Sequence, residues 1–254
     1  MSRSPELHLW DIDLADPGWD AGADTLDAAE AARFARIVVA SAATHQRRAR
    51  IALRHLLGRH IDARPRDLAF AYGAHGKPAL DGRRHGASPP EFNLSHSGDR
   101  AILAIAAAPV GVDIERGDRD LPDLDRLLDM TCAAAERAGL AGLAPARRRA
   151  AFFRLWTRKE AYCKAIGLGL AQPMHRFALA ETPAGSIVTD ADAPAPLPQE
   201  RDLPAPPHRC GGLHQLPHHV VDLPVAPGWF AAVCSPHAAP ALRRRQAHPP
   251  VGGV

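Results

Sequence analysis

Aromatic side chains and lysines are scarce in this chain of 254 residues. It has two Tyr, four Trp and seven Phe, and only three of its 31 basic residues are Lys. Proteins that bind single-stranded nucleic acid combine a basic groove with aromatic side chains on which the bases stack. With few aromatic residues and a formal net charge of +3, we expect no nucleic-acid partner.

Long apolar runs and paired cysteines are also missing. No run approaches the roughly 20 residues of a membrane span, and the first dozen residues are too polar for a signal-peptide core. We therefore expect a cytoplasmic protein without membrane contact. The four cysteines (Cys132, Cys163, Cys210 and Cys234) are widely spaced, which predicts free thiols in a reducing compartment.

The order of apolar patterns predicts an α+β fold, with helices and antiparallel-type strands in each half. We expect a pseudo-twofold pair of similar halves, residues 1–109 and 110–240, followed by a tail at 241–254. The Pro-rich segment 190–218 is typical of a long loop. Helices are expected over 25–40, 44–61, 121–142 with a break, and 146–166.

Two short acidic segments carry the strongest functional signal. On a strand through Gly111–Glu115, Val112 and Ile114 point to one face, and Asp113 and Glu115 to the other. An isolated Asp-x-Glu pattern also suits a solvated strand face. The apolar neighbours favour a buried strand, where unpaired carboxylates are costly, so a shared hard cation such as Mg²⁺ is predicted.

The second acidic segment reads as a helix. Trp156, Glu160 and Lys164 are four residues apart, so they form one stripe, while Lys159 falls on a different side. Glu160 and Lys164 could form a simple ion pair. Together with the strand carboxylates they predict a site for Mg²⁺ and phosphate.

Lysine placement supports this interpretation. Lys159 and Lys164 fall in the second segment, and Lys77 lies in the turn Gly76-Lys77-Pro78. An Arg-rich chain that retains Lys at these points favours a compact point charge there, although chance placement explains any one of them.

Further groups could bind phosphate. Asn93-Leu94-Ser95-His96-Ser97 places hydroxyl and imidazole groups at a strand end, and no Gly-x-Ser-x-Gly elbow supports a serine hydrolase. Arg50 and Arg54 share a helical stripe, which is either a solvated basic face or a grip on a second phosphate. A second cluster of potential metal ligands comprises His208, Cys210, His214, His218 and His219. A zinc site is disfavoured there, because these residues lack the paired spacing of zinc ligands.

Four motifs occur in order: Gly76-Lys77-Pro78, Phe92–Ser97, Val112–Glu115 and Leu155–Lys164. In this order and spacing the chain resembles the larger, monomeric 4′-phosphopantetheinyl transferases that serve peptide-synthetase and polyketide carrier proteins. The resemblance runs from about residue 44 to residue 180. It implies transfer of the phosphopantetheine arm of coenzyme A to a serine of an apo acyl or peptidyl carrier protein, and release of adenosine 3′,5′-bisphosphate.

The resemblance also implies residue roles. Asp113, Glu115 and Glu160 would bind Mg²⁺, with Glu160 or a water it orients as base and Lys164 on the pyrophosphate. Coenzyme A would contact the set Arg50, Lys77, Pro78, Asn93, Ser95, His96, Asp113 and Lys164. Two alternatives stay open: a metal-dependent nuclease or phosphodiesterase, and a carrier-binding module that has lost catalysis.

Overall fold

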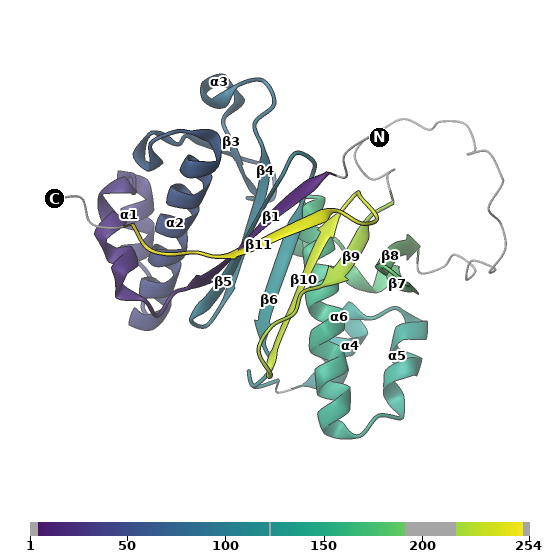
Figure 1. Cartoon of the computed structure of the whole chain (residues 1–254). Helices are drawn as coiled ribbons and strands as arrows, with labels where there is room; N and C mark the ends of the chain where they lie inside the picture. The colour runs from purple at the N-terminus through teal and green to yellow at the C-terminus, as the bar shows by residue number, and fades with distance from the viewer. Residues whose placement is uncertain (1–4, 122, 191–216, 251–254) are drawn as a thin grey trace.

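Two long helices, α2 (Ala40–Ile61) and α6 (Pro145–Ala165), each cover one β-sheet (Figure 1). The computed structural model describes residues 5–121, 123–190 and 217–250. The first sheet has the order β11-β1-β5-β4 and the second the order β6-β10-β9-β8-β7, and β2 and β3 form a separate hairpin. The α+β class predicted from the sequence is confirmed.

The strands are β1 (Glu6–Asp13), β2 (Phe70–Tyr72), β3 (Pro78–Leu80), β4 (Glu91–Ser97), β5 (Arg100–Ala106), β6 (Gly111–Arg116), β7 (Phe177–Thr182), β8 (Gly185–Asp190), β9 (His219–Asp222), β10 (Trp229–Ser235) and β11 (Ala241–Gln246). The shorter helices are α1 (Ala28–Ala35), α3 (Gly82–His85), α4 (Leu124–Thr131) and α5 (Ala134–Ala141). The remaining turns are 3-10 helices at Pro17–Thr25, Pro65–Asp67, Gly169–Ala171 and Met174–Arg176.

The core forms in layers because strand side chains alternate. On β1, Ile12 packs toward α2 in one cluster, whereas Leu7 and Leu9 pack toward the second sheet in another. Val112 and Ile114 of β6 lie in that second cluster, so the opposite face of β6 is left for Asp113 and Glu115.

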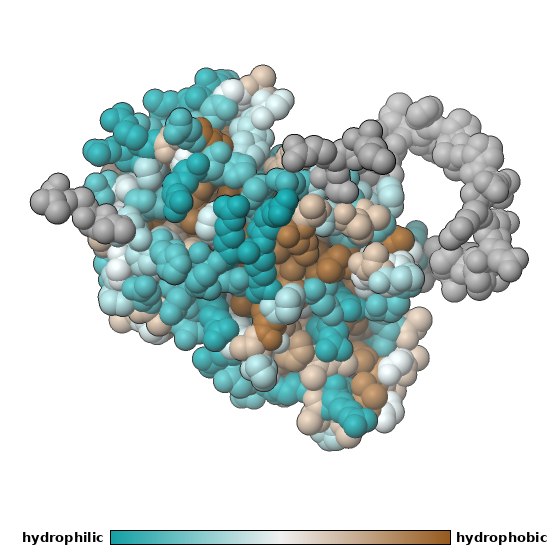
Figure 2. Space-filling view, viewed as in Figure 1, coloured by the Kyte–Doolittle hydropathy of each residue, from teal (hydrophilic) through white to brown (hydrophobic). Residues whose placement is uncertain are grey.

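The C-terminal segment departs from the prediction. Residues 241–254 were expected to form a tail, yet Ala241–Gln246 forms β11, which pairs in parallel with β1 from Glu6 to Asp11. Ala247 is buried in the core beside α2. The surface view shows hydrophilic side chains along β11, beside an apolar area over the second sheet (Figure 2). The strand was missed because the run Arg243–Gln246 is polar and because its pairing partner, β1, lies more than 200 residues away in the sequence.

The first helical region is also shorter than expected. One helix was predicted over 25–40, but α1 begins at Ala28, because Asp27 and Glu30 form a reciprocal capping box. The predicted loop at 190–218 lies largely outside the described residues. Within the described residues, no helix is long and apolar enough to cross a membrane.

Gly111 lets α6 approach β6 closely. A Cβ at this position would lie 2.0 Å from the carbonyl oxygen of Ala161 and 2.4 Å from the backbone nitrogen of Ala165. Both are backbone atoms of α6, so the helix would have to move away from the strand that carries Asp113.

We therefore expect Gly111→Ala to lower the free energy of unfolding by about 1–3 kcal/mol, the usual range for overpacking. Urea unfolding followed by circular dichroism measures this change. Gly139→Ala is the matched control, because a Cβ there meets nothing within 4 Å and alanine favours the helix. Equal stability of the Gly111 variant and wild type would contradict the close approach.

Candidate functional site

Asp113 and Glu115 lie on the face of β6 that turns away from the core between the sheets. Asp113 is 3% exposed, and its Oδ1 accepts a hydrogen bond from Ser95 Oγ at 2.8 Å. Glu115 Oε2 accepts one from Ser97 Oγ at 3.0 Å. The predicted carboxylate pair is therefore brought together with the predicted serine motif.

The serine motif joins the two halves of the protein. Asn93 Oδ1 accepts from the backbone N–H of Val112 at 2.8 Å, and Ser95 Oγ from that of Ile114 at 3.4 Å. Ser97 Oγ accepts from the N–H of Arg116 at 3.3 Å. Strands β4 and β6 are the edges of different sheets, so side chains spaced by two residues replace a main-chain ladder. This role was missed in the sequence, although the Asn-x-Ser-x-Ser alternation was a signal for it.

Helix α6 adds Glu160 and Lys164 to the same place. Lys164 Nζ donates to Asp113 Oδ1 at 2.5 Å and to Ser95 Oγ at 3.0 Å. Glu160 is 8% exposed, and within the described residues its carboxylate makes no hydrogen bond. Trp156 heads the stripe but belongs to the apolar cluster under α4, so it serves mainly as core.

The three carboxylates repel one another. Burial, followed by the charges of Asp113 and Glu115, raises the pKa of Glu160 to about 7 against an opposing effect of Lys164. Burial and the charge of Asp113 also raise the pKa of Glu115. Burial disfavours the charge on Lys164, yet its ion pair with Asp113 and the charge of Glu160 raise its pKa overall. The site thus holds more negative charge than Lys164 neutralises.

The raised pKa of Glu160, which is due mainly to burial, predicts a pH-dependent stability. A raised folded-state pKa means that the folded protein binds the proton of Glu160 more tightly than the unfolded chain does. Its contribution is complete below about pH 4.5 and is lost as pH rises through 7. We expect protein in EDTA to lose about 2 kcal/mol of unfolding free energy between pH 5 and pH 8.

Urea unfolding across that range measures the loss, and Glu160→Gln should flatten it. A wild-type profile as flat as that of the variant would contradict the raised pKa.

The donor set fits a divalent cation, although the carboxylates are not gathered around one point. Among the described residues, no group of three His, Cys, Asp or Glu side chains is placed to hold a metal ion. The physical reason is that Lys164 lies on Asp113, while Ser97 and Arg119 hold Glu115. Asp113 Oδ2 is nevertheless buried without a hydrogen-bond partner. A buried, unpartnered carboxylate oxygen beside two more carboxylates suits a hard cation such as Mg²⁺.

The other two lysines bind backbone carbonyls. Lys77 Nζ donates to Val110 O and Ala165 O, each at 3.1 Å, so it ties the β2–β3 hairpin to the C-terminal half. Lys159 is fully buried and forms an ion pair with Glu136 at 2.6 Å. All three lysines act as compact donors, and Lys164 is the one of the three that contacts Asp113.

The other residues predicted to contact coenzyme A, among them Arg50 and Pro78, are dispersed rather than gathered at the carboxylates. The Arg50 guanidinium pairs with Glu30 and lies 3.9 Å from the centroid of the Phe70 ring; Arg54 is 2% exposed and shares Glu30. A contact of Arg50 with a phosphate would therefore compete with Glu30. Pro78 begins β3, next to Lys77.

His96 lies between Ser95 and Ser97 on β4 and lines a hollow with Ser41, Ala42 and His45 of α2. The residue is exposed at the surface, yet partial burial of its ring lowers its pKa, and the charges of Lys164 and His45 lower it further. The imidazole is therefore neutral at pH 7 and can donate a hydrogen bond without adding charge.

The His and Cys residues for which zinc was considered and disfavoured lie only partly in the described part of the chain. His218 is buried, with its ring 5.2 Å from that of Tyr162 in an edge-on contact. His208, Cys210 and His214 lie outside the described residues. Cys132, Cys163 and Cys234 are buried free thiols, as expected.

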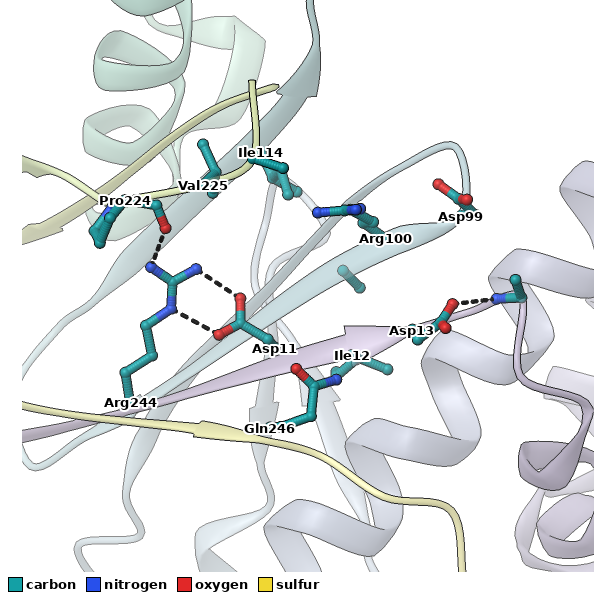
Figure 3. Close-up of a pocket in the computed structure, with 13 residues that line it drawn as sticks. Asp11, Ile12, Asp13, Asp99, Arg100, Ile114, Pro224, Val225, Arg244 and Gln246 are labelled. Carbon is teal, nitrogen blue, oxygen red and sulfur yellow. Dashed lines mark hydrogen bonds and ion pairs between the residues drawn. The ribbon is translucent and has the colours of Figure 1, made fainter. Parts of the chain in front are cut away.

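A hollow of about 640 Å³ opens on the other side of β6 (Figure 3). Its polar wall includes Asp11, whose two carboxylate oxygens accept from Nε and Nη2 of Arg244, and its apolar wall includes Pro224 and Val225. Strand β6 contributes Ile114, whose side chain points away from Asp113 and Glu115. The hollow is therefore separate from the carboxylate site despite its size.

Comparison with known proteins agrees with this arrangement. The family model described as the 4′-phosphopantetheinyl transferase superfamily matches residues 109–203. The 4′-phosphopantetheinyl transferase HetI of Nostoc sp. is 37% identical over 186 residues, which cover 71% of this chain and 76% of HetI. The transferase Sfp of Bacillus subtilis is 24% identical over 187 residues, 74% of this chain and 71% of Sfp.

A third relative, the transferase gsp of Aneurinibacillus migulanus, is 30% identical over 132 residues, and the match spans only about half of either chain, 52% of each. The family model covers the second half of the site, with Asp113, Glu115, Glu160 and Lys164, and HetI matches most of the chain. On this extent of similarity, the chain belongs to the 4′-phosphopantetheinyl transferase superfamily.

Proposed function

We propose that this chain transfers the 4′-phosphopantetheine arm of coenzyme A to a serine of an apo acyl or peptidyl carrier protein, in a Mg²⁺-dependent reaction that releases adenosine 3′,5′-bisphosphate. The observation that carries the metal is the unpartnered Oδ2 of the buried Asp113. Asp113, Glu115 and Glu160 would hold the ion, which would neutralise charge on the pyrophosphate.

The residues of this chain would divide the remaining work. Lys164 would bind a pyrophosphate oxygen and stabilise charge on the leaving bisphosphate. Neutral His96 would donate a hydrogen bond to a phosphate oxygen. Asn93 and Ser95 would keep β4 fixed on β6, so that the phosphate ligands of one half face the carboxylates of the other.

Glu160 would accept the proton of the attacking serine. General-base catalysis needs a carboxylate oxygen within hydrogen-bond reach of the serine hydroxyl. Its lack of a hydrogen bond within the described residues leaves the carboxylate available for an incoming hydroxyl. The proton would thus move from the serine Oγ to a Glu160 oxygen as the arm is transferred.

The test is carrier modification. The protein is incubated with coenzyme A, Mg²⁺ and apo carrier proteins from a peptide synthetase and a polyketide synthase, and intact masses are measured. We expect the carrier to gain the mass of the arm, and a carrier whose acceptor serine is replaced by alanine to gain nothing. Unmodified carriers with coenzyme A consumed, or no reaction with either carrier, would refute the proposal.

A further inference from the structure

Lys164 occupies half of the Asp113 carboxylate. Its Nζ lies 2.5 Å from Oδ1 and 3.0 Å from Ser95 Oγ, whereas Oδ2 is buried and has no partner. The carboxylate side chain is only 4% exposed, so water cannot readily replace either contact. The ammonium is therefore the main counter-charge that Asp113 has in the protein alone.

A divalent cation on the same carboxylate would meet this ammonium. Like charges within a few ångströms repel strongly where solvent is largely excluded. Arg119, the other cation near the cluster, lies 3.4 Å from Glu115 and is 48% exposed, so solvent screens it. Lys164 is thus the cation that a metal must displace.

An anion can bind the Lys164 ammonium that the metal displaces from Asp113. The Lys164 side chain is 26% exposed, so its tip can turn from Asp113 toward a ligand that binds outside the carboxylate cluster. A diphosphate that arrives there offers oxygens to both the ammonium and the metal. This step rests on the proposed function, because coenzyme A would supply the diphosphate.

We propose that Lys164 is a built-in competitor of the divalent cation: it holds Asp113 in the ligand-free protein, weakens binding of metal alone, and moves to the diphosphate when coenzyme A arrives. Metal and coenzyme A then bind with positive coupling. The carboxylates do not bind the metal tightly until the substrate is present.

Binding of Mn²⁺ without coenzyme A tests the first part. Free Mn²⁺ is measured by electron paramagnetic resonance with the wild type, Lys164→Met, Lys164→Gln and Arg119→Met. We expect both Lys164 variants to bind Mn²⁺ at least tenfold more tightly than the wild type. Arg119→Met also removes one positive charge near the cluster, and we expect a gain below threefold. Unchanged or weaker Mn²⁺ binding by folded Lys164 variants, checked by circular dichroism, would overturn the proposal.

The effect of coenzyme A on Mn²⁺ affinity, compared between the wild type and Lys164→Met, tests the second part. Coenzyme A should raise the Mn²⁺ affinity of the wild type at least tenfold, and that of Lys164→Met by less than threefold. Equal coupling in both proteins, or none in the wild type, would overturn the exchange of partners. The measurement with Mn²⁺ alone involves neither coenzyme A nor a carrier. The proposal about Lys164 can therefore be refuted while carrier modification succeeds, and it can be supported while carrier modification fails.

Discussion

Replacing Asp113 with alanine should lower the rate of arm transfer at least about a thousandfold, roughly 4 kcal/mol of transition-state stabilisation, while the protein stays folded. The change removes the buried oxygen that has no partner and the acceptor of the Lys164 ammonium. The metal would then lose a ligand beside the pyrophosphate, and Lys164 would lose the carboxylate that holds it in the ligand-free protein. The fold should survive because Glu115 and Glu160 still balance Lys164.

Single-turnover carrier modification followed by mass spectrometry measures this loss. Asp113→Asn keeps the size of the side chain and an acceptor for Ser95 but lacks the charge, so it should be nearly as slow as alanine. Asp67→Ala is the control, because Asp67 is 45% exposed and pairs with Arg64. The rate of arm transfer by this variant should stay within twofold of the wild-type rate. A well-folded Asp113→Ala enzyme at more than a tenth of the wild-type rate would remove Asp113 from the metal site.

The local parts of this site could be predicted from the sequence. Strand alternation placed Asp113 and Glu115 on one face, and helical spacing placed Glu160 and Lys164 on one stripe, because each pattern depends only on near neighbours. The fold class followed for the same reason. The roles of these residues as metal and coenzyme A ligands stay predictions.

The joining of the two segments could not be predicted from those patterns. It depends on Gly111, which lets the α6 backbone approach β6, and on Ser95, which lies between Asp113 and Lys164. These contacts connect residues far apart in the sequence, and periodicity within one segment carries no information about them. The strand β11 was missed for the same reason.

The positions of the three lysines were only partly explained from the sequence. At all three positions the ammonium donates to several closely spaced oxygens, an arrangement that suits a compact charge better than a planar guanidinium. At Lys77 and Lys159 those oxygens are backbone carbonyls. Helical spacing placed Lys159 away from Lys164, but it could not reveal that the other side is covered by α4 and the segment before β7.

Lys159→Met should lower the free energy of unfolding by about 3–5 kcal/mol, the usual cost of breaking a buried ion pair by removing one partner. The ammonium donates to the carbonyl oxygens of Thr131 at 2.9 Å, Met174 at 2.9 Å and Phe177 at 2.7 Å. Glu136, its counter-charge, also accepts from the backbone N–H of Leu179 at 3.0 Å. Methionine fits the space but leaves three buried acceptors and one carboxylate without their donor, and burial makes each loss costly.

Urea unfolding of both proteins at pH 7 measures the change. Arg154→Met is the matched control, because Arg154 lies on the same helix, is 60% exposed and only loosely pairs with Asp222 at 3.6 Å; its cost should stay below about 0.5 kcal/mol. Adding Glu136→Gln to Lys159→Met removes the uncompensated charge and should recover part of the loss. A Lys159→Met protein within 1 kcal/mol of the wild type would mean that water or a shifted side chain satisfies the carbonyls, and that Lys159 does not hold α4, α6 and β7 together.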